Sequence, residues 1–382
     1  MDFTIPEEYR MLQSLVKQYV EAELRPLEKQ IEELQDIPDD IWARLIARSK
    51  ELGLLAPFAP VEYGGGGVVG WLPHILMLEE VAKTSRCFGE TVARGYENGR
   101  DLATPYQIEN FYAPVWRGEQ RLCSAITEPD AGSDQRAMKT MAVRRGDRWM
   151  INGQKCFVSR LDKAAWAMVY AVTDKERRRI SSFIVPTSAP GVARGQRHKM
   201  MGEHGWNEFE VFFNDVQVPQ QNLLGQEGMA LRQFLHYIDL VRLRVAAYAI
   251  GACQYMVEQC VAYARDRHTF GKPIAARQAV QGMIVDSWME MESLRWVTYY
   301  CCWAADNGQK TFGLPAACKI MGSETGCRVA DRAIQVHGGS GYSGDLPFER
   351  IYRDMRGFKI TDGANEVLKH LVIARELLGP YD

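Results

Sequence analysis

Apolar and polar positions alternate with a helical period over about the first 120 residues. Between residues 9 and 20, apolar side chains recur every three or four positions, and the segment 41–55 repeats the pattern. Pro57, Pro60 and the glycines at 64–67 then interrupt it. We therefore predict an N-terminal α-helical domain over residues 1–120.

The pattern changes to short segments of period two after about residue 121. Such segments occupy residues 149–151, 166–172, 182–185 and 210–213. Gly146-Asp147 and Asn152-Gly153 have the composition of turns between strands. These features predict a middle antiparallel β domain, folded as a barrel or sandwich, over residues 121–228.

Long helical repeats return from Met229 onward. The predicted helices cover about 229–265, 279–306, 315–337 and 366–378, and glycines follow the last three. Four long helices with short connections predict a C-terminal four-helix bundle over residues 229–382. The fold class is thus mainly α with a central β domain.

Composition narrows the classes of function. A formal charge of -2 over 382 residues argues against nucleic acid or an anionic membrane as the main partner. No apolar run approaches the roughly 20 residues of a membrane helix, and the acidic N-terminus lacks signal-peptide character. The nine scattered cysteines indicate thiols in a reducing compartment, so we expect a cytoplasmic protein, or alternatively one that has already been processed. The seven histidines show no H-x-x-x-H spacing, so we expect no metal site.

Two glycine-rich segments, 65–70 and 339–344, match G-x-G-x-x-G. Neither follows a hydrophobic strand within a βαβ unit, so we do not expect a nicotinamide-binding Rossmann site.

The segment 125–134, Ala-Ile-Thr-Glu-Pro-Asp-Ala-Gly-Ser-Asp, lies upstream of Asn152-Gly153-Gln154-Lys155. Small, hydroxylated and acidic residues around Pro and Gly predict a turn that offers N–H groups and hydroxyls to an oxygen-rich ligand. The combination resembles the flavin-contacting signature of the acyl-CoA dehydrogenase family. The order of helical, β and helical-bundle regions also resembles that family's fold, over essentially the whole chain.

The resemblance implies that FAD is the cofactor and that the turn lines it. In that family Thr127 would bond the pyrimidine edge of the flavin, beside Ser124 and Ile126, and Ser133 would touch both flavin and the CoA ester. An ordinary capped turn is the alternative. The positions that usually hold Trp and Thr read Phe157 and Ser159, which keep an apolar ring and a hydroxyl. Core packing is the alternative for Phe157.

Two further motifs resemble the family's adenosine-side FAD site. The loop 265–274 would reach across a subunit interface to the pyrophosphate, with Arg267 as a cationic fork. The expected FAD contacts in these motifs are Arg267, Thr269, Phe270, Gln278, Gln335, Gly338 and Gly339. A plain helix end explains Gly338 alone. A site shared between chains implies a homo-oligomer, expected to be a tetramer built as a dimer of dimers.

The catalytic base is a departure from the usual pattern. Most members place a Glu in a Y-E-G-T motif, whereas this chain reads Thr361-Asp362-Gly363-Ala364-Asn365-Glu366. Another branch supplies the Glu from a helical position that is Val241 here. We therefore predict Asp362 as the base, Gly363 as a substrate contact, and Ala364 and Glu366 as FAD contacts. A helix N-terminal turn is the alternative role for Asp362.

The remaining substrate contacts are expected on the helix that would meet the pantetheine, at Asp239 and Arg242, unless they form only a salt-bridged or solvated pair. The charged segment 90–101 is either surface or a recognition element for a polar or cyclic acyl group. Glu90 or Glu97 is a candidate second base.

The leading hypothesis is an FAD-dependent acyl-CoA dehydrogenase that forms a 2-enoyl-CoA and passes electrons to an electron-transferring flavoprotein. An alternative is a flavin oxidase of a nitroalkane or an acyl-CoA with Asp362 as base. A second alternative is a non-catalytic scaffold that binds a partner protein or nucleic acid.

Overall fold

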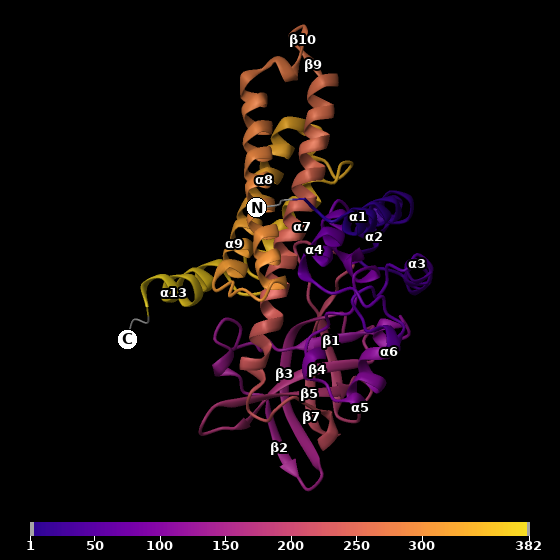
Figure 1. The fold of residues 1–382 in the computed structure, drawn as a ribbon, viewed down its shortest axis with the longest axis vertical. Helices are drawn as coiled ribbons and strands as arrows, with labels where there is room; N and C mark the ends of the chain where they lie inside the picture. Colours follow the sequence, from indigo (N-terminus) through magenta and orange to yellow (C-terminus); the bar gives the residue numbers. More distant parts are fainter. Residues whose placement is uncertain (1–3, 380–382) are drawn as a thin grey trace.

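The computed structural model describes residues 4–379. Figure 1 shows three regions: a β-sheet at one end, a pillar of long helices at the other, and the N-terminal helices along the side of both. The C-terminal helical segment projects sideways from the pillar.

The N-terminal region is helical, as predicted, with two long loops. The helices are α1 (Glu7–Tyr19), α2 (Glu28–Leu34), α3 (Asp39–Glu51), α4 (Trp71–Val81), α5 (Pro105–Gln107) and α6 (Ala113–Trp116). A π-helical stretch, Val20–Leu24, and a short 3-10 turn, Arg25–Leu27, join α1 to α2. Another π-helical stretch, Ile108–Tyr112, joins α5 to α6. Nearly all of α4 is buried, because it packs against both α1 and α7.

The middle region is one eight-stranded sheet within the described residues. Its strands are β1 (Leu122–Ala125), β2 (Met141–Arg145), β3 (Arg148–Ser159), β4 (Trp166–Asp174), β5 (Arg179–Pro186), β6 (Val192–Arg197), β7 (Glu208–Pro219) and β8 (Leu223–Leu224). The order is β6-β7-β3-β2-β4-β5-β8, with β1 beside β4. Most strand pairs are antiparallel, but β1 pairs with β4 in parallel, and β2 has one parallel pairing with β4.

The two predicted turns in this region have different outcomes. Gly146-Asp147 connects β2 to β3, where Arg145 pairs with Arg148. The prediction of a turn at Asn152-Gly153 is wrong, because both residues lie inside β3 at a shift of register against β7. Asn152 instead exchanges hydrogen bonds with Asp215 on β7, which holds the irregularity in place.

The pillar consists of α7 (Ala230–Asp266), α8 (Gln278–Asp306) and α9 (Leu314–His337), close to their predicted bounds. With 37 residues, α7 is about 55 Å long. The small strands β9 (His268–Thr269) and β10 (Lys272–Pro273) form the loop at the end of the pillar (Figure 1). Beyond α9 lie α10 (Gly339–Tyr342), α11 (Phe348–Gly357), α12 (Asn365–Val367), a π-helical stretch Leu368–Ala374, and α13 (Arg375–Leu378). The stretch Leu368–Ala374 packs on α9.

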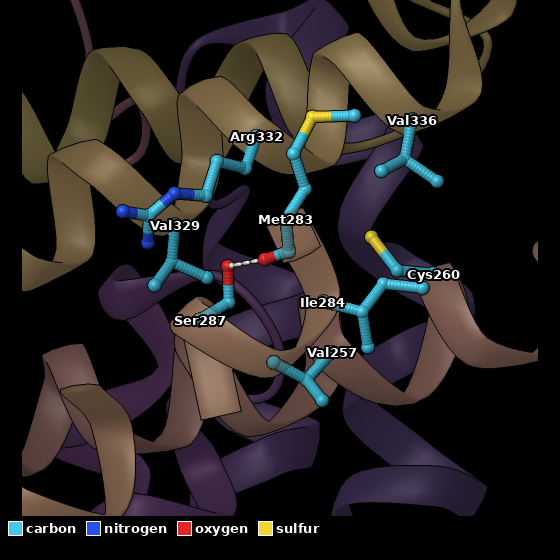
Figure 2. Close-up of a pocket in the computed structure, with 8 residues that line it drawn as sticks. All are labelled: Val257, Cys260, Met283, Ile284, Ser287, Val329, Arg332 and Val336. Carbon is cyan, nitrogen blue, oxygen red and sulfur yellow. Dashed lines mark hydrogen bonds between the residues drawn. The ribbon is translucent and has the colours of Figure 1, made fainter. Parts of the chain in front are cut away.

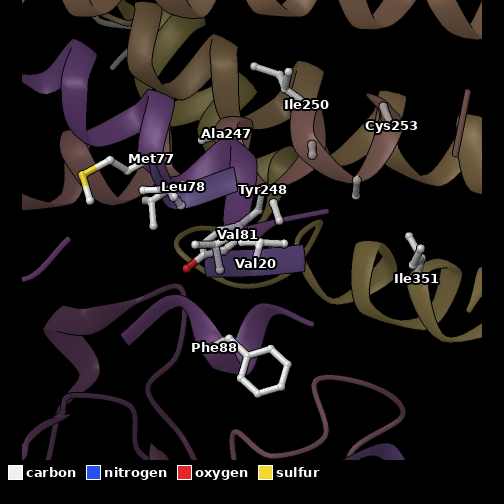
Figure 3. Packing of buried hydrophobic residues seen from close by; sticks show 14 of the residues in the cluster. Val20, Met77, Leu78, Val81, Phe88, Ala247, Tyr248, Ile250, Cys253 and Ile351 are labelled. Atoms are coloured by element: carbon white, nitrogen blue, oxygen red, sulfur yellow. The ribbon is translucent and has the colours of Figure 1, made fainter. Parts of the chain in front are cut away.

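One large apolar core joins the N-terminal helices to the pillar. Figure 3 shows Leu78 and Val81 of α4 close to Ala247 and Tyr248 of α7. Two smaller cores lie on the sheet region. None of the helices within residues 4–379 has both the length and the apolar character that a membrane span needs.

Candidate functional site

A cavity of about 320 Å³ lies where the three regions meet. Its walls come from α4, the segment 86–98, β1 with the turn that follows it, the end of β3, and α7. Four of the predicted site residues line it: Ser124, Ile126, Ser159 and Asp362. Residues predicted from separate motifs therefore meet at one place.

The turn after β1 is held by a buried lysine. Lys155 is fully buried, donates a hydrogen bond to the Ile126 carbonyl oxygen at 3.0 Å, and forms an ion pair with Glu128 at 2.9 Å. Burial lowers the pKa of Lys155 to about 8, although Glu128 acts in the opposite direction. The Cys156 N–H also donates to the Thr127 carbonyl oxygen. The Asn-Gly-Gln-Lys motif thus fixes the backbone beside the predicted flavin contacts.

Phe157 and Ser159 follow on the same strand. Phe157 has a left-handed backbone (φ 52°), is 52% exposed, and stacks on His198 with ring centroids 4.4 Å apart. This exposure rules out the core-packing alternative for Phe157. The Ser159 hydroxyl donates to Glu208 Oε1 at 2.8 Å. Burial raises the pKa of Glu208 to about 8, so this carboxyl holds a proton at neutral pH.

Asp362 lies in a tight turn with a left-handed backbone (φ 57°), followed by Gly363 (φ 99°). Lys319, fully buried, donates to the Gly363 carbonyl oxygen at 2.7 Å and to Asn365 Oδ1 at 2.9 Å. Asn365 in turn donates to Ser323 and Glu324. The turn is therefore anchored to α9 through buried polar groups.

The electrostatic surroundings of Asp362 are mixed. Burial raises its pKa, while Arg86, Lys319 and two arginines of α7 act in the opposite direction. Ala364, and not Asp362, occupies the N-terminal boundary of α12, with no side-chain cap. Asp362 therefore lies in the turn that precedes this helix but does not cap it.

The charged segment 90–101 divides into two parts. Glu90, Arg94, Tyr96 and Glu97 line the cavity, so the surface alternative is wrong for them, whereas Arg100 and Asp101 do not. The carboxylates of Glu90 and Glu97 already have partners within the protein. Glu97 accepts hydrogen bonds from the Trp116 indole and the Gly95 N–H, and Glu90 forms an ion pair with Arg160.

The predicted pantetheine contacts pair with each other. Arg242 and Asp239 form an ion pair at 2.9 Å across one turn of α7, and neither lines the cavity. Ser133 is exposed and also lies outside the cavity lining, and Glu366 is exposed at the start of α12.

The adenosine-side motifs lie far from the cavity, along the pillar. Arg267, Thr269 and Phe270 belong to the loop at its end, and Gln278 begins α8 (Figure 1). Phe270 is 98% exposed. Gln335, Gly338 and Gly339 are exposed at the end of α9. None of these residues lines the cavity of its own chain.

A second gap lies between α7, α8 and α9, lined by residues such as Val257, Met283 and Val329 (Figure 2). It has no room for a water molecule. Its walls are mainly apolar, and the Ser287 hydroxyl donates to the Met283 carbonyl oxygen within α8. This gap is a packing feature of the pillar and not a ligand site.

Sequence reasoning missed most of the cationic groups of the cavity. Arg86, Arg121, Arg160 and Arg244 line it, as does the buried His74. They come from separate segments with no shared motif, so no local pattern singles them out. Burial lowers the pKa of His74 well below its usual range, so this imidazole is neutral.

Comparison with known proteins identifies the family. Residues 6–117, 123–216 and 228–378 match the N-terminal, middle and C-terminal domains of acyl-CoA dehydrogenases. The chain is 34% identical to the probable acyl-CoA dehydrogenase YngJ of Bacillus subtilis, covering 99% of this chain and 100% of that protein. The chain belongs to the acyl-CoA dehydrogenase family. It is an oxidoreductase that acts on CH–CH donors, and its cofactor is FAD.

Two solved structures are similar over the whole chain. Butyryl-CoA dehydrogenase from Megasphaera elsdenii has a TM-score of 0.92 at 29% identity, covering 99% of this chain and all of that one. A chain from a structure described as the electron transferring flavoprotein of Acidaminococcus fermentans has a TM-score of 0.93 at 30% identity, covering both chains fully.

The predicted FAD contacts are chemically suited to that cofactor. The half-exposed Phe157 offers an aromatic face, and the turn after β1 offers backbone N–H groups and the partly exposed Thr127. The exposed guanidinium of Arg267 suits a pyrophosphate.

Proposed function

We propose that this acyl-CoA dehydrogenase forms a 2-enoyl-CoA with Asp362 as the catalytic base. The observation that carries the proposal is the position of Asp362, which lines the same cavity as Ser124, Ile126 and Ser159. The carboxylate of Asp362 takes the α-proton of a CoA thioester, and the electron pair of the Cα–H bond becomes the second bond between Cα and Cβ. The electron pair of the Cβ–H bond leaves with the hydride. FAD, when bound, accepts that hydride equivalent.

Each predicted site residue then has a chemical task. The Asp362 N–H polarises the thioester carbonyl, and burial brings the pKa of its side chain toward that of a carbon acid. Ser124, Ile126, Thr127, Ser133, Phe157 and Ser159 hold the flavin end of FAD. Ser133, Gly363, Asp239 and Arg242 contact the CoA thioester, and Ala364 and Glu366 contact FAD.

We also propose that two copies complete each FAD site. Arg267, Thr269, Phe270 and Gln278 of one copy would hold the pyrophosphate and adenosine, with Gln335, Gly338 and Gly339. The 98% exposure of Phe270 supports this, since a monomer would leave a large apolar ring in water. A homotetramer built as a dimer of dimers satisfies the requirement, and we retain domain boundaries at 120 and 228.

An electron-transferring flavoprotein is the proposed electron acceptor. The likeness to a chain in a structure described as such a flavoprotein supports this choice. The nine cysteines are all free thiols, which supports the proposed cytoplasmic location.

Anaerobic titration of the purified protein with a panel of acyl-CoAs tests the function. Bleaching of the oxidised flavin band by one class of thioester is expected, and Asp362→Ala should abolish it while FAD remains bound. Undiminished bleaching in that variant would refute Asp362 as the base. Rapid reoxidation of the reduced enzyme by air would point to the oxidase alternative.

A further inference from the structure

Three arginines of the cavity gather around one aromatic ring. The guanidinium carbon of Arg121 lies 3.5 Å from the centroid of the Trp42 ring, and those of Arg94 and Arg160 lie at 5.8 and 5.9 Å. Arg94 follows α4, Arg121 precedes β1, and Arg160 follows β3, so three separate segments converge here. We name Arg94, Arg121 and Arg160 the arginine cluster.

The cluster is short of anionic partners. Within residues 4–379, no carboxylate lies within 4.0 Å of the guanidinium groups of Arg94 or Arg121. Arg94 donates instead to the backbone oxygens of Glu90 and Val115. The other cavity arginines, Arg86 and Arg244, form an ion pair and a hydrogen bond with residues outside the cluster.

Arg160 carries unused hydrogen-bond donors. Its residue is 6% exposed, and its Nε and Nη2 atoms have no hydrogen-bond partner, although Glu90 forms an ion pair with it. Buried donors without a partner destabilise the folded protein, so a native protein usually supplies a partner. Nε and Nη2 together form the fork that binds a carboxylate through two parallel hydrogen bonds.

The rest of the wall mixes polar and apolar side chains. Tyr96, Glu97, Asn98, Tyr237 and Tyr248 line it beside the arginines. Tyr96, Glu97 and Asn98 hydrogen-bond within the protein, so the donors of Arg160 are the groups that an alkyl chain would leave without a partner.

We propose that the cavity binds an acyl group carrying a carboxylate, so that the substrate is the mono-CoA thioester of a dicarboxylic acid. The distal carboxylate pairs with Arg160 and Arg121, and Arg94 adds positive charge behind them. The thioester end lies toward Asp362. This inference rests on the proposed function, because it places the acyl chain in the cavity that Asp362 lines.

Matched pairs of thioesters test the proposal on the FAD-loaded enzyme. Each dicarboxylic mono-CoA thioester, such as glutaryl-CoA or adipyl-CoA, is compared with the monocarboxylic thioester of the same carbon number. Anaerobic flavin bleaching gives an apparent Kd for each. The dicarboxylic member of at least one pair should bind about ten- to hundredfold more tightly.

Variants of the cluster show whether the arginines cause that preference. Arg121→Gln should reduce the preference by about tenfold or more without weakening the monocarboxylic partner, and Arg121→Lys should keep part of it. Arg121 has no carboxylate partner to leave unpaired, so this variant is safer for folding than Arg160→Gln. Arg145→Gln, on the exposed end of β2, is the matched control.

The outcomes separate the two proposals. If no thioester bleaches the flavin, the proposed function fails. If monocarboxylic thioesters bleach it as well as or better than their dicarboxylic partners, the function stands and the carboxylate site is refuted. Equal weakening of both members by Arg121→Gln would also refute it, because the arginine would then hold the CoA phosphates common to both.

Discussion

The ammonium group of Lys319 donates a hydrogen bond to the carbonyl oxygen of Gly363, at 2.7 Å, one residue beyond the proposed base. The lysine is fully buried on α9, and burial lowers its pKa to about 8, while Asp362 acts in the opposite direction. The contact fixes a turn in which two successive residues have a left-handed backbone. The position of the Asp362 carboxylate therefore depends on α9 as well as on its own turn.

Lys319→Met should lower the rate of flavin reduction while FAD stays bound. The variant removes two donors and leaves Asn365 Oδ1 with fewer partners, so we also expect a loss of about 1–3 kcal/mol of stability. Stopped-flow reduction by a substrate thioester measures the effect on rate. Lys310→Met, in the exposed loop before α9, is the control and should change neither quantity. An unchanged reduction rate in Lys319→Met would show that the turn holds its shape alone.

Arg244→Gln should shift the pH dependence of the reaction. Burial raises the pKa of Asp362, and Arg244 is one of the cations that act against this effect. A base works only when deprotonated, so activity should rise with pH through the pKa of Asp362. Removing the positive charge should raise that pKa further and move the acid limb of kcat/KM to higher pH.

The amide of the Arg244→Gln variant retains hydrogen-bonding capacity toward His74, which limits the structural damage. Arg232→Gln, exposed in the first turns of α7, is the matched control. An acid limb that stays in place in Arg244→Gln would argue that another group sets it.

Trp288→Glu should break the assembly of copies. One face of α8 exposes large apolar side chains at spacings that recur on a single side of a helix: Val285, Trp288, Met289, Trp296, Tyr300 and Trp303. Such a continuous apolar face marks an interface. Analytical ultracentrifugation should show smaller species for the variant, and its FAD content should fall if two chains complete each FAD site as proposed.

Met11→Glu is the control for that experiment. Met11 is 67% exposed on α1 and does not belong to the apolar face of α8, so its substitution should leave assembly intact. A fully assembled Trp288→Glu protein would show that another surface joins the copies.

Regular elements were predictable from the sequence because their signal is local. The helical period predicted α7, α8 and α9 to within a few residues, and glycines marked the ends of α8 and α9. The same signal was present in α11, where Phe348, Ile351 and Met355 are buried at spacings of three and four, but we did not predict this helix. The prediction of a turn at Asn152-Gly153 was wrong because the residues that favour a turn also favour a bulge within a strand.

The candidate site was only partly predictable. Motifs led to Ser124, Ile126, Ser159 and Asp362, which meet at the cavity. The arginine cluster is different, since Arg94, Arg121 and Arg160 are brought together by tertiary packing around Trp42 and share no spacing. Lys319 likewise has no sequence signal that distinguishes it from other helical lysines, and only the structure shows its contact with Gly363.

Glu208→Gln should flatten the dependence of stability on pH. Burial raises the pKa of Glu208 to about 8, against which the Ser159 hydrogen bond acts weakly. Between an unfolded pKa near 4.5 and a folded pKa near 8, the folded protein holds one proton more than the unfolded chain at this site. The free energy of unfolding must therefore decrease as pH rises through that window.

Glutamine keeps the neutral hydrogen-bonding character of the protonated acid and cannot ionise. The fall in melting temperature between about pH 6 and pH 8 should consequently be smaller in Glu208→Gln than in the parent protein. Other buried groups titrate in the same pH range, so the test compares the pH dependence of the melting temperature between the variant and the parent protein. Glu227→Gln, exposed before α7, should reproduce the parent slope. If Glu208→Gln also reproduces it, Glu208 is ionised in the folded protein and accepts the Ser159 hydrogen bond as a carboxylate.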